Sequence, residues 1–307
     1  MQETIGTTLM TAGRALRGTV TERRWAMCLL DQDLQGVLEG RPLTGSVMEP
    51  AARNTYWADP CVTGHRTNAW VFAEELERWR GLGHIVALHV VDGAVVSRRA
   101  VLAGQHHLSF PQIHRFEDGW IGTVETCDPD PRVYVFRELG DPWKPTEWRL
   151  PTDLIDPALS RHHDGSWRLT ATLRSRNGYG PVVTYASALT EPADWNLVDS
   201  TDYGLLARSG GTCDFERGLR SVQDCSKNYG LSLSILRWPR ERRSVLDIRG
   251  GDVHTSPASS WLGIHTCAWN TEGTVVVVDL WTRRWQPLSA IHRWREFRDD
   301  PCRLTGG

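Results

Sequence analysis

Hydrophobic and polar residues alternate with a period of two along most of the chain, which predicts β-strands. Five segments repeat one plan: a short apolar strand, a tight turn that usually ends in Gly, and a second strand with alternating apolar positions. They begin at Tyr56, Phe110, Leu154, Ala207 and Trp261. Their turns contain pairs such as Asp164-Gly165, a strong hairpin signal because Gly accepts the positive φ that a tight turn requires. The chain therefore contains a repeated β-hairpin.

Further strands extend each hairpin into a larger unit. A third apolar strand follows most hairpins, at residues 84–91, 132–139, 181–189 and 229–238, and a Trp-bearing fourth strand follows two of them, at residues 141–150 and 190–198. Four-stranded units that recur roughly every 45–55 residues are typical of propeller blades. We therefore predict an all-β fold, a five-bladed β-propeller with four-stranded blades around a central channel. A β-sandwich with several hairpins is the alternative.

The two ends of the chain predict how the ring closes. Residues 22–30 are strand-like and precede the first complete blade, so we expect them to supply the missing outer strand of the last blade, beside residues 285–294. Such closure removes an exposed sheet edge. We expect an N-terminal extension at residues 1–18, one propeller domain at residues 19–298 and a C-terminal tail at residues 299–307.

The composition excludes several classes of protein. Of 307 residues, 40% are hydrophobic and 23% are charged, and the net charge is -2, whereas nucleic-acid-binding domains are usually clearly basic. The sequence has no run of about 18 apolar residues to span a bilayer, and its start lacks the apolar core of a signal peptide. The seven cysteines form no C-x-x-C pair, which favours buried free thiols in a reducing cytoplasm. A Cys213–Cys225 disulfide is the alternative.

Polar residues on the predicted inner strands indicate a site on the propeller axis. The first strands carry Asp59, His107, Asp156, Arg208 and His265, and the second strands add Glu74, Glu75, Glu125, Gln223, Asp224 and Asp279. Several polar groups that converge on one channel indicate either a binding site or a structural ion-pair network.

Asp59 and Asp156 share a local context, because each directly precedes a proline. Proline restricts the residue before it to extended conformations, so each Asp is expected to project from a strand end. Two such carboxylates can act as base or nucleophile and as transition-state stabiliser in sugar chemistry. The alternative is that Asp-Pro only starts a strand and caps its turn.

The segment RSVQDCSKNYG at residues 220–230 is rich in polar groups. Arg220 can bind a carboxylate or phosphate through two hydrogen bonds, and Gln223 with Asp224 can hydrogen-bond to hydroxyl groups. The alternative is a loop whose polar side chains form hydrogen bonds with its own backbone. His265 is expected either to hydrogen-bond in the core or to hold a hydrated ion in the channel. The sequence lacks zinc-site spacing, a P-loop, G-x-G-x-x-G and G-x-S-x-G, so we expect no bound metal or cofactor beyond that ion.

Several of these segments resemble a known family. The runs HLSFPQI, DGWIGTVET, LIDPALSRHHDGSWRLTAT and GLRSVQDCSKNYGLSLSI make residues 55–280 resemble the amino-terminal propeller domain of glucosamine inositolphosphorylceramide transferases. More distantly, the blade number and the two Asp-Pro motifs resemble the five-bladed glycoside hydrolases of the arabinanase, β-xylosidase and levansucrase type. This second resemblance implies that Asp59 is base or nucleophile, that Asp156 is stabiliser, and that a fourth-blade Glu is general acid. The chain departs from that pattern, because Arg208 stands where the Glu is expected.

We therefore predict a glycoside hydrolase-like enzyme that acts on a sugar-containing or polyhydroxylated small molecule, such as a tailoring enzyme of specialised metabolism. The candidate catalytic residues are Asp59, Asp156, Asp224 and Glu125. The candidate substrate-binding residues are Glu75, His107, Arg208, Arg220, Gln223, Tyr229 and His265. The alternatives are a propeller that binds a glycan or anionic ligand without chemistry, and a non-hydrolytic cyclase or isomerase. The transferase resemblance also implies a separate transferase as a partner.

Overall fold

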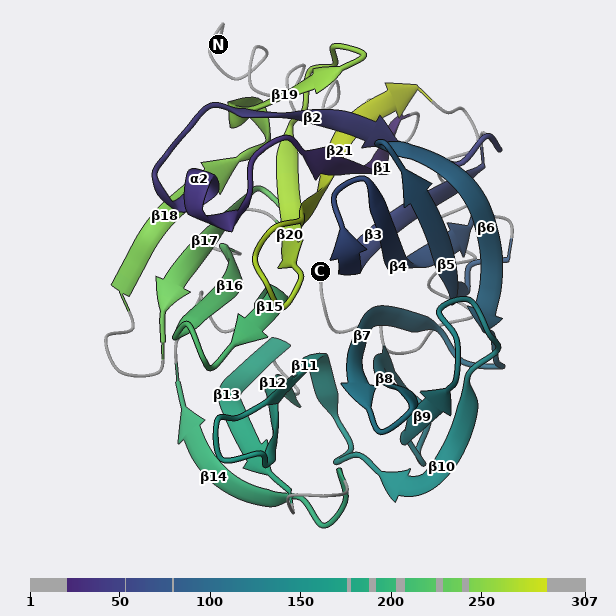
Figure 1. Ribbon diagram of the computed structural model, residues 1–307, viewed down its shortest axis with the longest axis vertical. Coiled ribbons are helices and arrows are strands. Elements are labelled where there is room, and N and C mark those ends of the chain that lie inside the picture. Colours follow the sequence, from purple (N-terminus) through teal and green to yellow (C-terminus); the bar gives the residue numbers. More distant parts are fainter. Residues whose placement is uncertain are drawn as a thin grey trace, which may run out of the picture.

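The computed structural model shows a ring of antiparallel β-sheets (Figure 1). It describes residues 21–52, 54–78, 80–175, 178–187, 192–202, 208–224, 229–238 and 243–285. The expected extension at residues 1–18 and tail at residues 299–307 lie outside these ranges. The described strands form five blades around a common centre, and the predicted five-bladed propeller is confirmed.

Blades I to III are separate four-stranded sheets, each in simple sequence order from the centre outwards. Blade I consists of β3 (Thr55–His65), β4 (Asn68–Glu77), β5 (Gly83–Val91) and β6 (Ala94–Leu102). Blade II consists of β7 (Leu108–Phe116), β8 (Gly119–Thr126), β9 (Arg132–Phe136) and β10 (Lys144–Arg149). Blade III consists of β11 (Leu154–Arg161), β12 (Trp167–Ser175), β13 (Gly178–Ala186) and β14 (Asn196–Thr201).

Blades IV and V are joined at the centre by a parallel contact between Gly211 and Cys267. Blade IV consists of β15 (Ser209–Asp214), β16 (Leu219–Asp224), β17 (Ser232–Arg237) and β18 (Arg243–Arg249). Blade V consists of β20 (Gly263–Trp269), β21 (Val276–Trp285), β1 (Thr21–Leu30) and β2 (Leu43–Met48), with β19 (Val253–Ser256) added outside β2. The short helices α2 (Leu34–Leu38) and η2 (Gly250–Asp252) complete the described elements.

The N-terminal strands close the ring, although not in the expected position. β1 pairs antiparallel with β21 from Thr21 opposite Trp285 to Leu29 opposite Val277. It is therefore the third strand of blade V, and β2 supplies the outer strand that we expected from residues 22–30. The expected partner at residues 285–294 was also wrong, because the pairing runs along residues 277–285. Third and fourth strands show the same alternation, so the sequence pattern does not tell them apart.

Each of the five innermost strands contains a β-bulge near its middle. Asp59 and Asp156 lie in two of these bulges with φ of 52° and 48°, and Phe110 occupies the corresponding place in β7 with φ of 49°. The expectation that each Asp projects from a strand end was therefore wrong. Proline removes the right-handed helical conformation from the preceding residue, and a short Asp tolerates positive φ, so the dipeptide builds a bulge inside the strand.

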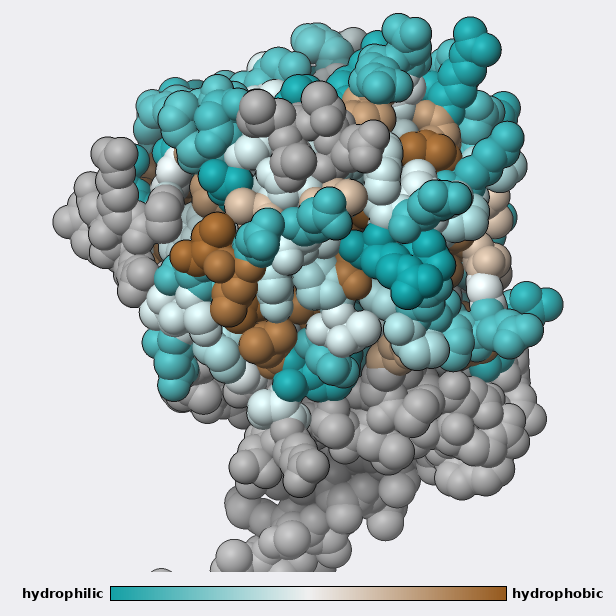
Figure 2. Space-filling model, turned by 90° about the horizontal axis from the view of Figure 1, so that it is seen from below, coloured by the Kyte–Doolittle hydropathy of each residue, from teal (hydrophilic) through white to brown (hydrophobic). Residues whose placement is uncertain are grey.

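Apolar clusters between neighbouring blades form the core. Phe72 and Ile85 of blade I pack with Val124 and Trp143 of blade II, and similar clusters join the other blades. Trp143 and Trp167 are buried in these clusters. The side that carries β10 and β14 is mostly hydrophilic with a smaller hydrophobic area (Figure 2). Leu197 and Val198 of β14 are exposed.

The cysteines depart from the sequence expectation. Cys28, Cys61, Cys213 and Cys267 are free, so the alternative Cys213–Cys225 disulfide was wrong. Cys127 is disulfide-bonded, so the cysteines are not all free thiols. Among the described residues, no helix combines the length and the apolar character needed to cross a bilayer.

Candidate active site

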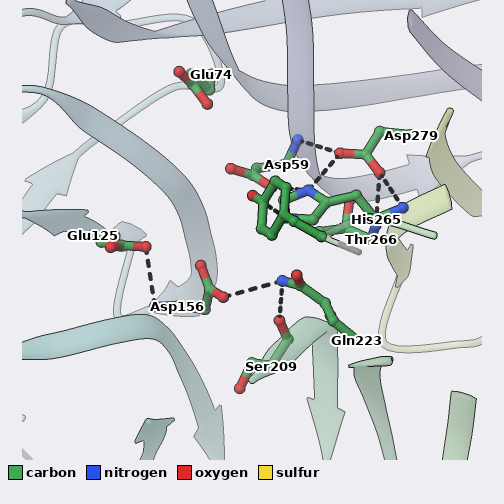
Figure 3. Close-up of polar contacts among 12 residues, drawn as sticks. Asp59, Glu74, Glu125, Asp156, Ser209, Gln223, His265, Thr266 and Asp279 are labelled. Atoms are coloured by element: carbon green, nitrogen blue, oxygen red, sulfur yellow. Dashed lines mark hydrogen bonds and ion pairs between the residues drawn. The ribbon is translucent and has the colours of Figure 1, made fainter. Parts of the chain in front are cut away.

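Asp59 and His265 form the first of two polar centres near the propeller axis (Figure 3). The bulge in β3 turns Asp59 inward, and its Oδ1 lies 3.0 Å from Nδ1 of His265. The Asp59 backbone N–H donates to Oδ2 of Asp279 at 3.0 Å. Asp59, Asp279 and His265 are all at least 95% buried, so their charges interact in a poorly solvated environment.

Asp279 of β21 holds this centre together. Its Oδ1 accepts the backbone N–H groups of His265 at 3.1 Å and Thr266 at 2.6 Å, which are the groups that the bulge in β20 releases from the strand ladder. Its Oδ2 lies 3.2 Å from Nδ1 of His265. Asp279 thus ties blade V to blade I. Its signal in the sequence is a single acid directly after four valines, because a buried charge requires partners.

His265 lies between two carboxylates and a tyrosine. Burial acts to lower its pKa, but the charges of Asp279 and Asp59 overcome burial and raise the pKa of His265 to about 10. The ring is therefore an imidazolium at neutral pH, and both of its nitrogens donate. Nδ1 faces the two carboxylates, and Nε2 contacts the hydroxyl of Tyr229.

Asp156 is the core of the second centre. The bulge in β11 directs its carboxylate to Arg208, which binds it through Nε and, at 3.2 Å, through a terminal nitrogen. Nε2 of Gln223 donates to Oδ2 of Asp156 at 3.1 Å and to the carbonyl of Ser209 at 2.7 Å. Asp156 has no exposed surface. Arg208 and Gln223 of blade IV therefore bind the side chain of Asp156 in blade III.

Glu125 of β8 completes this centre. Its Oε2 accepts the backbone N–H of Asp156 at 3.1 Å, and its Oε1 lies 3.2 Å from a terminal nitrogen of Arg174. Burial raises the pKa of Asp156 to about 8, with Arg208 opposing and the charge of Glu125 adding to the rise. Burial also acts to raise the pKa of Glu125, but Arg208, Asp156 and Arg174 hold it below its usual range. The two shifts have opposite directions, so Asp156 keeps a proton to higher pH than Glu125 does.

Tyr229 connects the two centres. Its hydroxyl contacts Nε2 of His265, and the guanidinium of Arg208 lies over its ring at 4.7 Å from the ring centre. Trp25 packs against both Tyr229 and His265, with ring centres 6.3 Å and 5.1 Å away. A cation over an aromatic face is attracted to it. Tyr229 therefore contacts His265 through its hydroxyl and stabilises Arg208, the partner of Asp156, through its ring.

Glu75, a candidate for substrate binding, points away from these centres. Its carboxylate accepts from Trp57 at 2.8 Å, from Nε of Arg98 at 2.7 Å, and lies 3.3 Å from Nε2 of His84. Although burial acts to raise it, these partners bring the pKa of Glu75 to about 2. The side chain of the neighbouring Glu74 points to the opposite face of β4 and lies in the region of the two centres (Figure 3).

His107 pairs with Glu74 rather than with either centre. Its Nδ1 accepts the backbone N–H of Gly83 at 2.9 Å, so the proton of the neutral ring is on Nε2, which lies 3.3 Å from Oε1 of Glu74. The side chain of His107 is 10% exposed. His107, at the start of blade II, is thus held by Gly83 and Glu74 of blade I in one orientation of its ring.

Arg220 and Asp224 lie on β16 but outside the two centres. Arg220 has no exposed surface and donates to Oγ of Ser209 at 3.1 Å, a position inside blade IV rather than in an open site. Asp224 ends the strand and accepts from Oγ of Ser232 at 3.2 Å. Of the eleven predicted site residues, the structure brings together Asp59, Glu125, Asp156, Arg208, Gln223, Tyr229 and His265.

Asp59, His265 and Asp279 also have the residue types of a metal site, with ligand atoms within 4.8 Å of one another. The same contacts also fit an imidazolium between two carboxylates, and Asp279 already accepts three backbone N–H groups. A hydrated ion beside His265 stays a prediction.

Comparison with known proteins supports the fold. No known family matches the sequence, and no curated protein matches it. An α-L-arabinofuranosidase of Podospora anserina, solved in complex with cellotriose, is 12% identical with a TM-score of 0.54 over 78% of this chain and 95% of that one. The catalytic domain of a Coprinopsis cinerea GH62 α-L-arabinofuranosidase is 12% identical with a TM-score of 0.50 over 86% and 98%. The chain therefore shares the five-bladed propeller fold of glycoside hydrolases.

Proposed function

We propose that the protein is a glycoside hydrolase-like enzyme that cleaves a sugar-containing small molecule by carboxylate acid/base chemistry. The observation that carries the proposal is the Glu125–Asp156 pair. Two neighbouring carboxyl groups whose pKa values move apart, one raised to about 8 and the other lowered, are typical of acid/base machinery. A carboxyl group that keeps its proton at neutral pH is suited to protonate a leaving group.

Asp59 provides the complementary carboxylate. Hydrolysis of a glycosidic bond requires one acid that protonates the leaving oxygen and one carboxylate that activates water or attacks the anomeric carbon. In the proposed reaction the Glu125–Asp156 pair gives its proton to the leaving group, and Asp59 takes a proton from water as the new C–O bond forms. The imidazolium of His265, 3.0 Å from Oδ1 of Asp59, fixes the orientation of that carboxylate.

The shared fold supports a glycoside as substrate, since both structures compared above are α-L-arabinofuranosidases. We propose a furanosyl or pyranosyl glycoside of a small molecule, as a tailoring enzyme in a cytoplasmic biosynthetic route would require. The likeness to the amino-terminal domain of glucosamine inositolphosphorylceramide transferases, and a separate transferase as partner, remain parts of this proposal.

The test measures turnover of a panel of 4-nitrophenyl glycosides that includes the α-L-arabinofuranoside. Asp59→Asn and Asp156→Asn should each lower kcat/KM by roughly 100-fold or more under conditions in which the variants remain folded. Asp118→Asn, an exposed residue in the β7–β8 turn, is the matched control. Full activity of Asp59→Asn would contradict the assignment.

A propeller that binds a glycan or anionic ligand without chemistry is the second candidate. The observation that favours it is the complete burial of Asp156 beneath Arg208 and Gln223, which is also how a structural ion pair is built. This function predicts no turnover of any glycoside in the panel, together with ligand binding that Asp59→Asn leaves intact.

A further inference from the structure

A separate pocket of about 360 Å³ lies between blades II and III. Its walls come from the end of β8 and the loop that follows it, from the connection between β10 and β11, and from Arg174 of β12. Ligand pockets in proteins typically start at about 300 Å³. The volume therefore suits a single ring of monosaccharide size.

The pocket adjoins the second polar centre. Pro157, which lines it, directly follows Asp156 in the β11 bulge, and Arg174, which also lines it, lies 3.2 Å from Oε1 of Glu125. Only one side chain therefore separates a group in the pocket from the pair that holds the transferable proton. Because the charge of Arg174 is already paired with Glu125, Arg174 joins the pocket to the centre rather than supplying a free cation.

The lining combines acceptors with flat apolar surfaces. Asp128 and Asp153 add two carboxylates, Thr126 and Thr152 add hydroxyl groups, and four prolines contribute rings. A sugar ring matches both features, because its hydroxyl groups donate to carboxylates while its C–H face packs against apolar rings. A phosphate or carboxylate ligand does not match, because two acids of its own sign would face it.

Asp153 links the pocket wall to the strand that carries Arg174. It has φ of 60°, a conformation that a short Asp tolerates, and its carbonyl accepts the backbone N–H of Arg174 at 2.8 Å. This hydrogen bond fixes the position of the wall relative to β12.

We propose that this pocket is a second sugar subsite, so that the substrate carries a hydroxyl-rich ring beyond the bond that is broken. The inference rests on the proposed hydrolase function and deepens it: the preferred substrate is a disaccharide or longer glycoside, and the leaving sugar occupies the space between blades II and III.

Thr152→Trp tests this inference, because Thr152 is exposed at the pocket and an indole there fills the space without touching Glu125 or Asp156. Thr271→Trp, an exposed threonine in the β20–β21 turn, is the matched control. Two substrates are compared: a glycosyl fluoride, whose leaving group is a single atom, and a disaccharide with the same cleaved sugar.

Thr152→Trp should lower kcat/KM for the disaccharide about 10-fold or more and change it less than about 2-fold for the fluoride. Thr271→Trp should change neither. Equal effects of Thr152→Trp on the two substrates, or none on either, would overturn the subsite and leave the hydrolase function standing.

If the wild type turns over neither substrate, the proposed function fails, and binding tests the pocket independently. Saturation-transfer NMR with free arabinose and xylose should then show contacts that Thr152→Trp abolishes and Thr271→Trp retains. Identical spectra for the wild type and Thr152→Trp would overturn the pocket as a sugar site.

Discussion

The carboxylate of Glu125 accepts the backbone N–H of Asp156 at 3.1 Å, across the boundary between blades II and III. Asp279 does the same for Asp59 at 3.0 Å, across the boundary between blades V and I. In both cases an acid on a second strand satisfies an N–H group that lies in the bulge of the next blade. Each of these two bulges thus directs a carboxyl group toward the axis, and an acid of the neighbouring blade holds the bulge in place. The geometry of the site therefore depends on the closure of the ring.

Glu125→Gln should lower the pKa of Asp156, because the charge of Glu125 is one of the causes that raise it. The pH at which kcat/KM declines on the alkaline side should move down, because the acid loses its proton at a lower pH. Glu216→Gln, an exposed residue in the β15–β16 turn, serves as control. An unchanged alkaline limb would show that Asp156 is not the proton donor.

Arg208→Met should destabilise the fold by about 3 kcal/mol above about pH 8, where Asp156 is ionised, because a buried carboxylate then loses its cation. Asp156→Asn in the same chain should recover most of this loss, since it removes the carboxylate that needs the pairing. Denaturant titration of the two single variants and the double variant gives the coupling between these residues. Additive effects would contradict the pairing of Arg208 with Asp156.

Tyr229→Phe separates the two roles of Tyr229. It removes the hydroxyl that contacts His265 and keeps the ring under Arg208. A stability loss of about 1 kcal/mol is expected from the lost hydrogen bond. Tyr229→Leu should cost more, because it also removes the aromatic face under the guanidinium. Equal losses for the two variants would show that the cation–ring contact contributes nothing measurable.

The architecture was accessible from sequence because each blade repeats local signals. Period-two alternation and turn glycines such as Gly165, with φ of 82° in the structure, are fixed by neighbouring residues in the chain. The inward position of Asp59 and Asp156 was also predicted, but the bulge that produces it was not. A bulge depends on the register of two strands, and the sequence of one strand does not contain that register.

The same limit explains the choice between Glu74 and Glu75. Consecutive residues in a strand point to opposite faces, so a bulge in the partner strand decides which of the two faces the centre. Glu75 was predicted for the site, and Glu74 lies in its region instead. The pairing of Asp156 with Arg208 joins residues 52 positions apart, and only the closed ring brings them together.

The pKa of His265 predicts how stability depends on pH. The folded-state value of about 10 lies above the ordinary value of 6.5, so the folded protein binds this proton more tightly than the unfolded chain. Its contribution to stability is fully present below about pH 6.5 and is lost as pH rises through about 10. The pKa of Asp156 is also raised, to about 8, so its contribution to stability likewise declines as pH rises, and this decline is complete near pH 8. Between pH 8 and 10 the change in stability therefore reports the titration of His265.

Across that range one retained proton lowers the free energy of unfolding by about 1.4 kcal/mol per pH unit. His265→Gln should remove this slope while being less stable than the wild type at every pH, because Asp59 and Asp279 lose their cation. Urea denaturation at pH 8, 9 and 10 measures both slopes. The buried thiols, whose pKa values are also raised, titrate in both proteins and cancel in the difference. Parallel curves would show that His265 is not held as an imidazolium between the two carboxylates.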